Sequence, residues 1–235
     1  MIMYLERLER ALPDVQRRIE RACERAGRSD DESVTVVAVT KGHPVEATLA
    51  AREAGLQVIG ESRVQEARAK WEATGDLGLS WHLVGHLQRN KVQRALQMFE
   101  LIHSVDSLRL AAAIDQEAAR LGRSVSILVQ VNASSEESKF GFTVDDAFDP
   151  IRDICDLVHV RVRGLMTMAP FVDDRSVLRE TFRRTCVLFE RCRDELRRFD
   201  AAHLSMGMTN DFEIAVEEGS TMVRLGTVLF GERLR

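Results

Sequence analysis

The stretch TVVAVTK at residues 35–41 decides the fold, since it is a short run of β-branched and small apolar residues that ends on a lysine. Gly42, His43 and Pro44 follow it directly, and an amphipathic segment, Val45–Ala54, comes next. A β-branched run of this length is typical of a buried strand, and an apolar period near 3.6 predicts a helix. The stretch therefore predicts one unit of strand, turn and helix.

The same unit recurs along nearly the whole chain. Eight runs are predicted to be strands, and they cover Thr35–Lys41, Gln57–Ser62, Trp81–His86, Leu101–Asp106, Ser126–Ala133, Val160–Met168, His203–Met208 and Met222–Phe230. The intervening segments predict helices, most clearly Val45–Ala54, Val64–Ala73, Arg89–Phe99, Leu108–Leu121, Asp174–Phe199 and Asp211–Glu218, with a further helix, Leu5–Ala26, before the first strand. Alternation of strands and helices favours a parallel sheet, and eight units favour a closed barrel over an open sheet. The first turn also lacks GxGxxG and phosphate-loop motifs. We therefore expect one α/β domain, residues 1–235, folded as a single (β/α)8 TIM barrel with an extra N-terminal helix.

The longest predicted helix, Asp174–Phe199, carries one apolar stripe at spacings of three and four residues, which ends in Leu196 and Phe199. Its other faces carry six arginines interleaved with acidic residues. Such a mixture predicts a solvated helix face rather than a patch for RNA or phosphate.

The composition excludes several classes of protein. The chain of 235 residues has 33 basic and 37 acidic side chains and a formal charge of −4, so we expect no nucleic-acid partner. Its four cysteines form no CxxC pair, which argues against a disulfide framework and fits a reducing compartment. We expect no secretory leader, because the opening stretch MIMYLERLER has no apolar run after a basic one, and the sequence holds no apolar run of membrane-spanning length. We therefore expect a cytoplasmic protein without a membrane partner, and a monomer because no apolar stripe is left over.

Functional residues of a TIM barrel lie at the carboxyl ends of its strands, and Lys41 ends the first strand. One interpretation is a surface lysine that starts a loop. The other is a partly desolvated amine with a lowered pKa, which is suited to form a Schiff base.

The last two strands carry a second candidate site. Ser205 and Gly207 end the seventh strand, and Gly226 and Thr227 lie in the eighth. Barrels often bind phosphate with the loops after these strands, although the glycines could merely relieve crowding. An amine on strand one and a phosphate site on strands seven and eight indicate a ligand with both an aldehyde and a phosphate. Pyridoxal 5′-phosphate (PLP) and a sugar phosphate of an aldolase both fit.

Arg224 lies two residues before Gly226, so it shares the strand face of that glycine. It could lie near the ring nitrogen of PLP, where it would leave that nitrogen unprotonated and weaken the electron sink. It could equally pair with a buried carboxylate, and the candidates are Glu61, Asp106 and Glu217.

Two histidines share one face of the third strand, namely His82 and His86. Their spacing would suit zinc on a helix, but on a strand it places them two pleats apart. We therefore expect hydrogen-bonded barrel histidines, or a ligand-site histidine at His86, rather than a metal site.

Several motifs, in order along the chain, resemble the pyridoxal phosphate homeostasis protein family. They are VAVTKGHP, GESRVQEA, WHLVGHLQRNK, IHSVDS, VNASSEESKFGF, GLMTM, LSMGMTNDFEIAVEEGSTMVRLG and FGER. The resemblance implies a barrel similar to the N-terminal domain of alanine racemase. It implies PLP held as a Schiff base on Lys41, an arginine facing the ring nitrogen, which is Arg224, and phosphate contacts from the LSMGM and RLGT motifs. These contacts fall on Ser205, Met206, Gly226 and Thr227.

The resemblance also implies a function in PLP homeostasis, that is, buffering the cofactor and delivering it to apoenzymes without a clear catalytic reaction. The alternatives are a racemase-like PLP enzyme with weak activity and a Schiff-base aldolase. A racemase needs a second acid or base, yet the only tyrosine is Tyr4, near an N-terminus expected to fray. The aldolase needs a proton relay, for which Lys139 is a candidate. Ser62 and Phe140 depart from the family pattern, which puts a contact at Ser62 in doubt.

Overall fold

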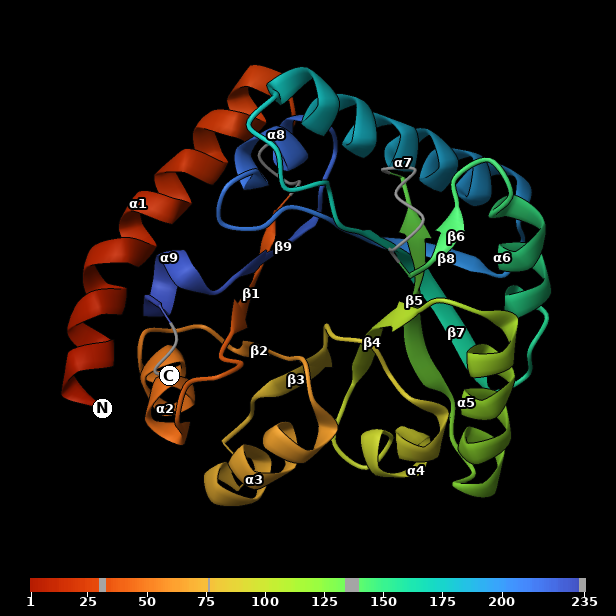
Figure 1. Cartoon of the computed structure of the whole chain (residues 1–235), viewed down its shortest axis with the longest axis horizontal. Coiled ribbons are helices and arrows are strands. Elements are labelled where there is room, and N and C mark those ends of the chain that lie inside the picture. Colours follow the sequence, from red (N-terminus) through yellow and green to blue (C-terminus); the bar gives the residue numbers. More distant parts are fainter. Residues whose placement is uncertain (30–32, 76, 134–139, 233–235) are drawn as a thin grey trace.

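The computed structural model describes residues 1–29, 33–75, 77–133 and 140–232, and it confirms the closed barrel. Eight parallel strands form the ring in the order β1 (Thr35–Val39), β2 (Val58–Glu61), β3 (Ser80–Leu83), β4 (Leu101–Val105), β5 (Val125–Asn132), β7 (Val160–Thr167), β8 (Phe199–Ser205) and β9 (Met222–Leu225). Pairing of β9 with β1 and of β4 with β5 leaves no open edge in this ring. A short strand, β6 (Phe142–Thr143), pairs alongside β5. Figure 1 shows the strands enclosed by helices.

The helices cover the outside of the barrel (Figure 1). They are α1 (Ile2–Ala26), α2 (Val45–Glu53), α3 (Val64–Thr74), the 3-10 turn η1 (Arg89–Lys91), α4 (Val92–Ala95), α5 (Leu108–Arg120), α6 (Phe148–Cys155), α7 (Arg175–Glu195), α8 (Phe212–Glu217) and α9 (Thr227–Phe230). The expected extra helix, α1, packs along α2, α8 and α9. Among the helices in the described ranges, none is both long and apolar enough to cross a membrane.

Alternation along the strands separates two cores. Residues such as Ala38, Ile59 and Leu225 face outward and pack against the helices in one large cluster. Residues of the other parity face the inside of the barrel, where a small apolar cluster is made by Val37, Val39, Leu101, Leu128, Met166 and Met222. Buried polar side chains share the barrel interior with it, and these are His82, His103, Gln130, Ser205 and Arg224.

Several predicted boundaries were wrong: the helix expected over Arg89–Phe99 ends at Ala95, the strand expected over His203–Met208 is Phe199–Ser205, and two further boundaries assign residues to the wrong type of element. The helix expected to reach Phe199 ends at Glu195, and Phe199 begins β8 instead. Phe199 continues the apolar stripe because its ring packs edge-on against Phe189 of α7, with centroids 5.6 Å apart. The strand expected over Met222–Phe230 ends at Leu225, and residues 227–230 form α9. The amide of Phe230 bonds the carbonyl of Gly226 at 2.8 Å, so a β-branched run here closes a helical turn.

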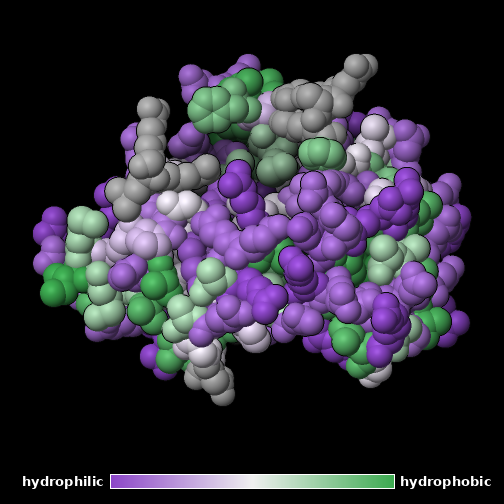
Figure 2. Space-filling model, turned by 60° about the horizontal axis from the view of Figure 1, so that its bottom comes forward, coloured by the Kyte–Doolittle hydropathy of each residue, from purple (hydrophilic) through white to green (hydrophobic). Residues whose placement is uncertain are grey.

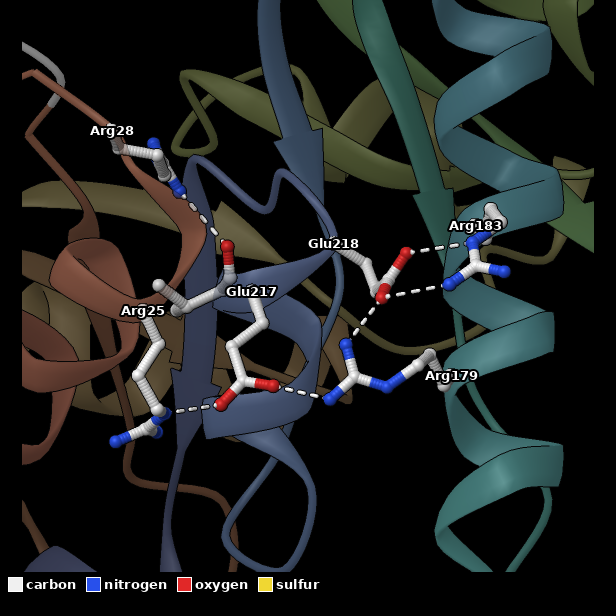
Figure 3. A network of polar contacts seen from close by, with 7 residues as sticks. Arg25, Arg28, Arg179, Arg183, Glu217 and Glu218 are labelled. Atoms are coloured by element: carbon white, nitrogen blue, oxygen red, sulfur yellow. Dashed lines mark hydrogen bonds and ion pairs between the residues drawn. The ribbon is translucent and has the colours of Figure 1, made fainter.

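Ion pairs tie the outer helices together. Figure 3 shows arginines of α1 and α7 converging on Glu217 and Glu218 at the end of α8. Arg25 Nε lies 2.7 Å from Glu217, and Arg179 contacts both glutamates. Five arginines of α7 are paired with acidic side chains, as predicted for a solvated face, and they are Arg179, Arg183, Arg184, Arg191 and Arg193. Figure 2 shows hydrophilic side chains over the middle of one face, with hydrophobic ones gathered mainly along its upper edge and at lower left.

Candidate functional site

A pocket of about 250 Å³ opens at the carboxyl ends of the strands. Its lining comes from β1 and the turn after it, from β9, and from the segments that follow β3, β7, β8 and β9. The lining residues include Val39, Lys41, His43, Val84, Met168, Ala169, Pro170, Phe171, Met208, Thr209, Asn210, Asp211, Arg224, Gly226, Thr227 and Gly231. Four of the six residues predicted to bind the cofactor thus border one pocket.

Lys41 lies two residues beyond the end of β1, in a tight turn. The turn closes through the amide of His43, which donates to the carbonyl of Thr40 at 3.0 Å, and Gly42 adopts a φ of 74°. Both neighbours of Lys41 are held from α3: Lys70 Nζ donates to the Thr40 carbonyl at 2.7 Å, and the Gly42 amide donates to Glu66 at 2.5 Å. The backbone that carries the amine is therefore fixed on both sides.

A buried ion pair supports this turn from behind. Lys70 Nζ lies 2.6 Å from Glu61 Oε1, and the Thr40 hydroxyl donates to the same oxygen at 2.7 Å. Glu61 is fully buried, and its other oxygen has no partner among the described residues. Burial raises the pKa of Glu61, and the neighbouring ammonium of Lys70 opposes this rise.

Arg224 is buried between the pocket and the barrel interior, and it pairs with none of the three carboxylates considered from the sequence. Its guanidinium donates to the carbonyl and the hydroxyl of Ser205, each at 2.8 Å, and to the carbonyl of Thr167 at 2.8 Å. These bonds use three of its five N–H groups, and the others have no acceptor among the described residues. Burial lowers the pKa of Arg224 to about 10, and Asp211 opposes the shift, so the side chain stays cationic at neutral pH.

Gly226 and Thr227 form the pocket wall where β9 gives way to α9. A Cβ on Gly226 would lie 3.2 Å from the carbonyl oxygen of Val39 and would crowd the wall beside the pocket. Thr227 is exposed and brings a hydroxyl to the lining, as does Thr209 from the segment after β8. The two threonines supply donors of the kind that a phosphate accepts.

The other two predicted residues do not border the pocket. Ser205 is fully buried beneath Arg224 and reaches the site only through it. Met206 packs in the outer core, and its amide donates to the carbonyl of Met222 at 3.1 Å. The residue of the LSMGM motif that does line the pocket is Met208.

Three residues of uncertain role are placed differently. His86 Nδ1 donates to the Asp106 carboxylate at 2.9 Å, and the His86 ring stacks on Phe140 with ring centroids 4.4 Å apart, outside the pocket lining. Ser62 also lies outside that lining. Lys139 falls outside the described residues.

Sequence reasoning missed Asp211 and the segment from Ala169 to Phe171 as pocket residues. Asp211 accepts the Met208 amide at 2.5 Å, and burial raises the pKa of its carboxyl. The rule that strand ends carry function could have found the segment, since it directly follows β7. Tyr4 was also misjudged: it is buried, and its hydroxyl lies 3.2 Å from Nδ1 of His43, which lines the pocket.

The family model described as alanine racemase, N-terminal domain, matches residues 11–234. A pyridoxal phosphate homeostasis protein of Aquifex aeolicus is 42% identical over 231 residues, covering 97% of each chain. One of Escherichia coli strain K12 is 37% identical over 227 residues, covering 94% of this chain and 95% of the relative. The chain belongs to the pyridoxal phosphate homeostasis protein family. The resemblance inferred from the motifs is confirmed.

Solved structures agree with this family. PipY of Synechococcus elongatus, solved with PLP bound, is 36% identical with a TM-score of 0.79, covering 91% of this chain and 100% of PipY. Alanine racemase of Clostridium difficile 630 in complex with cycloserine has a TM-score of 0.77 at 15% identity, covering 97% of this chain and 60% of the racemase. The latter likeness shows that this chain shares the barrel fold of that enzyme.

Proposed function

We propose that this chain binds PLP in the pocket at the barrel mouth, with Lys41 as the covalent anchor, and that it holds the cofactor for cellular PLP homeostasis. One observation carries the proposal: Lys41 and Arg224 line the same pocket, at the carboxyl ends of two neighbouring strands. The amine of Lys41 would condense with the PLP aldehyde, so that a C=N bond forms and one water leaves.

The sheet register supports this assignment. Arg224 is level with Val37 on the neighbouring strand, so Lys41 stands four residues further toward the mouth. β1 runs two residues beyond Val37, which is about 7 Å, before the turn that carries Lys41, so the pocket separates the arginine from the lysine backbone. The remaining N–H groups of Arg224 would face the ring nitrogen.

The phosphate would meet Thr227, Thr209 and the bare backbone at Gly226. These residues share the wall of the pocket next to β9, and a larger residue at Gly226 would crowd the same place. Ser205 supports the site by holding Arg224, so it acts as a positioning residue.

Arg224 also supports holding rather than catalysis. An arginine stays protonated at neutral pH, so it donates a hydrogen bond to the ring nitrogen without transferring its proton. The ring nitrogen therefore stays unprotonated, which weakens the electron sink on which PLP catalysis relies. The finer proposal is therefore that the bound PLP is passed to apoenzymes. This predicts that the loaded protein reactivates a PLP-dependent apoenzyme, and a loaded protein that leaves the apoenzyme inactive would contradict delivery.

One observation favours a second candidate function, a weak racemase-like proton transfer. His43 lines the pocket two residues after Lys41, and Tyr4 contacts its ring, so a second titratable group borders the site. Exchange of the Cα proton of alanine for deuterium, catalysed by wild type and lost in His43→Phe, would establish this activity.

The absorption spectrum of the purified protein tests the main proposal. We expect a visible band on addition of PLP, which borohydride reduces and fixes on the tryptic peptide that contains Lys41. Lys41→Ala should lose the fixed label, whereas Lys91→Ala, a control at the surface-facing turn η1, should keep it. A wild-type protein that takes up no PLP would refute the proposal.

The cysteines support a reducing, cytoplasmic location as part of the proposal. Cys23, Cys155, Cys186 and Cys192 are all free thiols. Proteins of oxidising compartments commonly pair their cysteines.

A further inference from the structure

A line of hydrogen bonds runs through the barrel interior from the pocket to the opposite end. Arg224 bonds Ser205 Oγ at 2.8 Å, and Ser205 Oγ lies 3.0 Å from His103 Nδ1. His103 Nε2 lies 3.0 Å from His82 Nδ1, and the other His82 nitrogen lies 3.2 Å from Ser80 Oγ. Ser80 then donates to Glu100 at 2.7 Å. Ser80 begins β3 and Glu100 precedes β4, so this end lies at the amino ends of the strands.

The two ends of the line fix its direction. A guanidinium can only donate, and a carboxylate can only accept. Because the single hydroxyl proton of Ser80 goes to Glu100, its oxygen must accept from His82 Nε2. The Nδ1 atom of His82 must then accept from His103 Nε2, and His103 Nδ1 must accept the proton of Ser205. Ser205 in turn accepts from Arg224, so every donor points the same way.

We infer that a directional relay of hydrogen bonds positions the Arg224 guanidinium at the cofactor pocket, and that it is formed by Ser80, His82, His103 and Ser205. The relay ends at the Glu100 carboxylate at the far end of the barrel, and both histidines are in the Nε2–H form. The part of this inference that concerns PLP rests on the proposed function. The positioning part concerns the chain's own groups, since Ser205 is the only side chain among the described residues that accepts from Arg224.

The surroundings of the histidines suit this role. Burial lowers the pKa of His82 to about 3, and burial also places the pKa of His103 well below its usual value. The charged or titratable neighbours that act on the relay are His203, which lowers the pKa of both rings, Arg224, which lowers that of His103, and Asp211, which acts on Arg224. Both rings are therefore neutral at pH 7, and each can accept at one nitrogen and donate at the other.

Two-dimensional long-range ¹H–¹⁵N spectra of the histidine side chains test the relay in the protein without PLP. We expect His82 and His103 each to show a protonated Nε2 and an unprotonated Nδ1. Neither ring should titrate between about pH 6 and pH 8, the range in which an ordinary histidine changes its charge. A proton on Nδ1 of either ring would overturn the inference, whether or not the protein binds PLP.

The second measurement is PLP affinity in variants at the far end. Ser80→Ala removes the hydroxyl that receives the His82 proton, and Glu100→Ala removes the final acceptor, while both leave the pocket residues unchanged. We expect each to shift the His82 signals and to raise the Kd for PLP about fivefold, the value of one net hydrogen bond. Glu72→Ala is the matched control, because Glu72 lines the same surface groove as Glu100 but pairs with Arg68.

The two measurements distinguish a failure of the relay from a failure of the proposed function. Histidine signals and PLP affinity of Ser80→Ala and Glu100→Ala that match those of Glu72→Ala would overturn the relay. A wild type with the expected tautomers that fails to bind PLP would refute the proposed function while supporting the hydrogen-bond direction.

Discussion

Replacing Lys70 by methionine tests how the buried ion pair supports the turn of Lys41. Lys70 gives one proton to Glu61 at 2.6 Å and another to the Thr40 carbonyl at 2.7 Å, and the exposed fractions of the Lys70 and Glu61 side chains are 6% and 0%. Methionine has nearly the same length and fills the space, so the variant removes the charge without leaving a large cavity. Glu61 then remains as an uncompensated buried carboxylate.

The structure sets the size of the expected effect. Removing one partner of a buried ion pair costs about 3–5 kcal/mol of the free energy of unfolding. For a chain of this length each kcal/mol lowers Tm by about 2–4 °C, so we expect a fall of roughly 6–20 °C at pH 8. Since burial already raises the pKa of Glu61, loss of Lys70 raises it further. A carboxyl with a raised pKa destabilises the fold as pH rises through that pKa, so the loss should shrink toward pH 5.

Thermal unfolding at pH 5 and pH 8 provides the assay. The double variant Lys70→Met, Glu61→Gln removes the unpaired charge, so it should recover at least half of the stability lost at pH 8. Arg68→Met is the control on the same helix, because its pair with Glu72 is exposed and is worth at most about 1 kcal/mol. A loss below about 1 kcal/mol in Lys70→Met, or one that is the same at both pH values, would refute the reasoning.

Further predictions concern the pocket, the surface and the thiols. Arg224→Lys keeps the charge but loses the planar fork that holds two backbone carbonyls, so we expect PLP to bind about tenfold more weakly in an absorbance titration, and an unchanged Kd would remove the arginine from the site. Glu217→Ala should lower the free energy of unfolding by about 1 kcal/mol in urea at low salt and by less in high salt, because its arginine partners are partly exposed; an effect that grows with salt would contradict this. Cys155 and Cys192 should stay unlabelled by a thiol reagent in the folded protein, because burial raises the pKa of each to about 12, and both should react once urea unfolds the chain; rapid labelling in native buffer would count against this.

The barrel could be predicted because two separate sequence signals indicate its strands, namely β-branched composition and alternation with amphipathic helices. The rule that strand ends carry function placed Lys41 at the barrel end where ligands bind, and alternation placed Arg224 on the strand face of Gly226; the structure brings both to one pocket. Boundaries failed where two elements share an apolar run, as at Phe199, since a stripe that packs on one core does not reveal where the helix ends.

Other site features depend on contacts between residues far apart in the sequence. His103 and Ser205 are 102 positions apart, and no local pattern links them. The burial of Tyr4 likewise follows from the docking of α1 against α9, where its ring meets Phe230 with centroids 6.4 Å apart. An N-terminal residue is expected to fray unless such docking holds it.

The polar layer inside the barrel couples the stability of the fold to the geometry of the site. Buried polar groups are tolerated when each finds a partner, and leaving one unsatisfied costs about 1–3 kcal/mol. Arg224, Ser205 and His103 satisfy one another, and Gln130 donates to the carbonyl of Phe140 at 3.0 Å. A substitution in this layer therefore removes one polar group and also leaves its neighbour without a hydrogen-bond partner. Because the arginine at the pocket is one member of the layer, it cannot move without that cost, and a stable barrel keeps it aimed at the pocket before any ligand arrives.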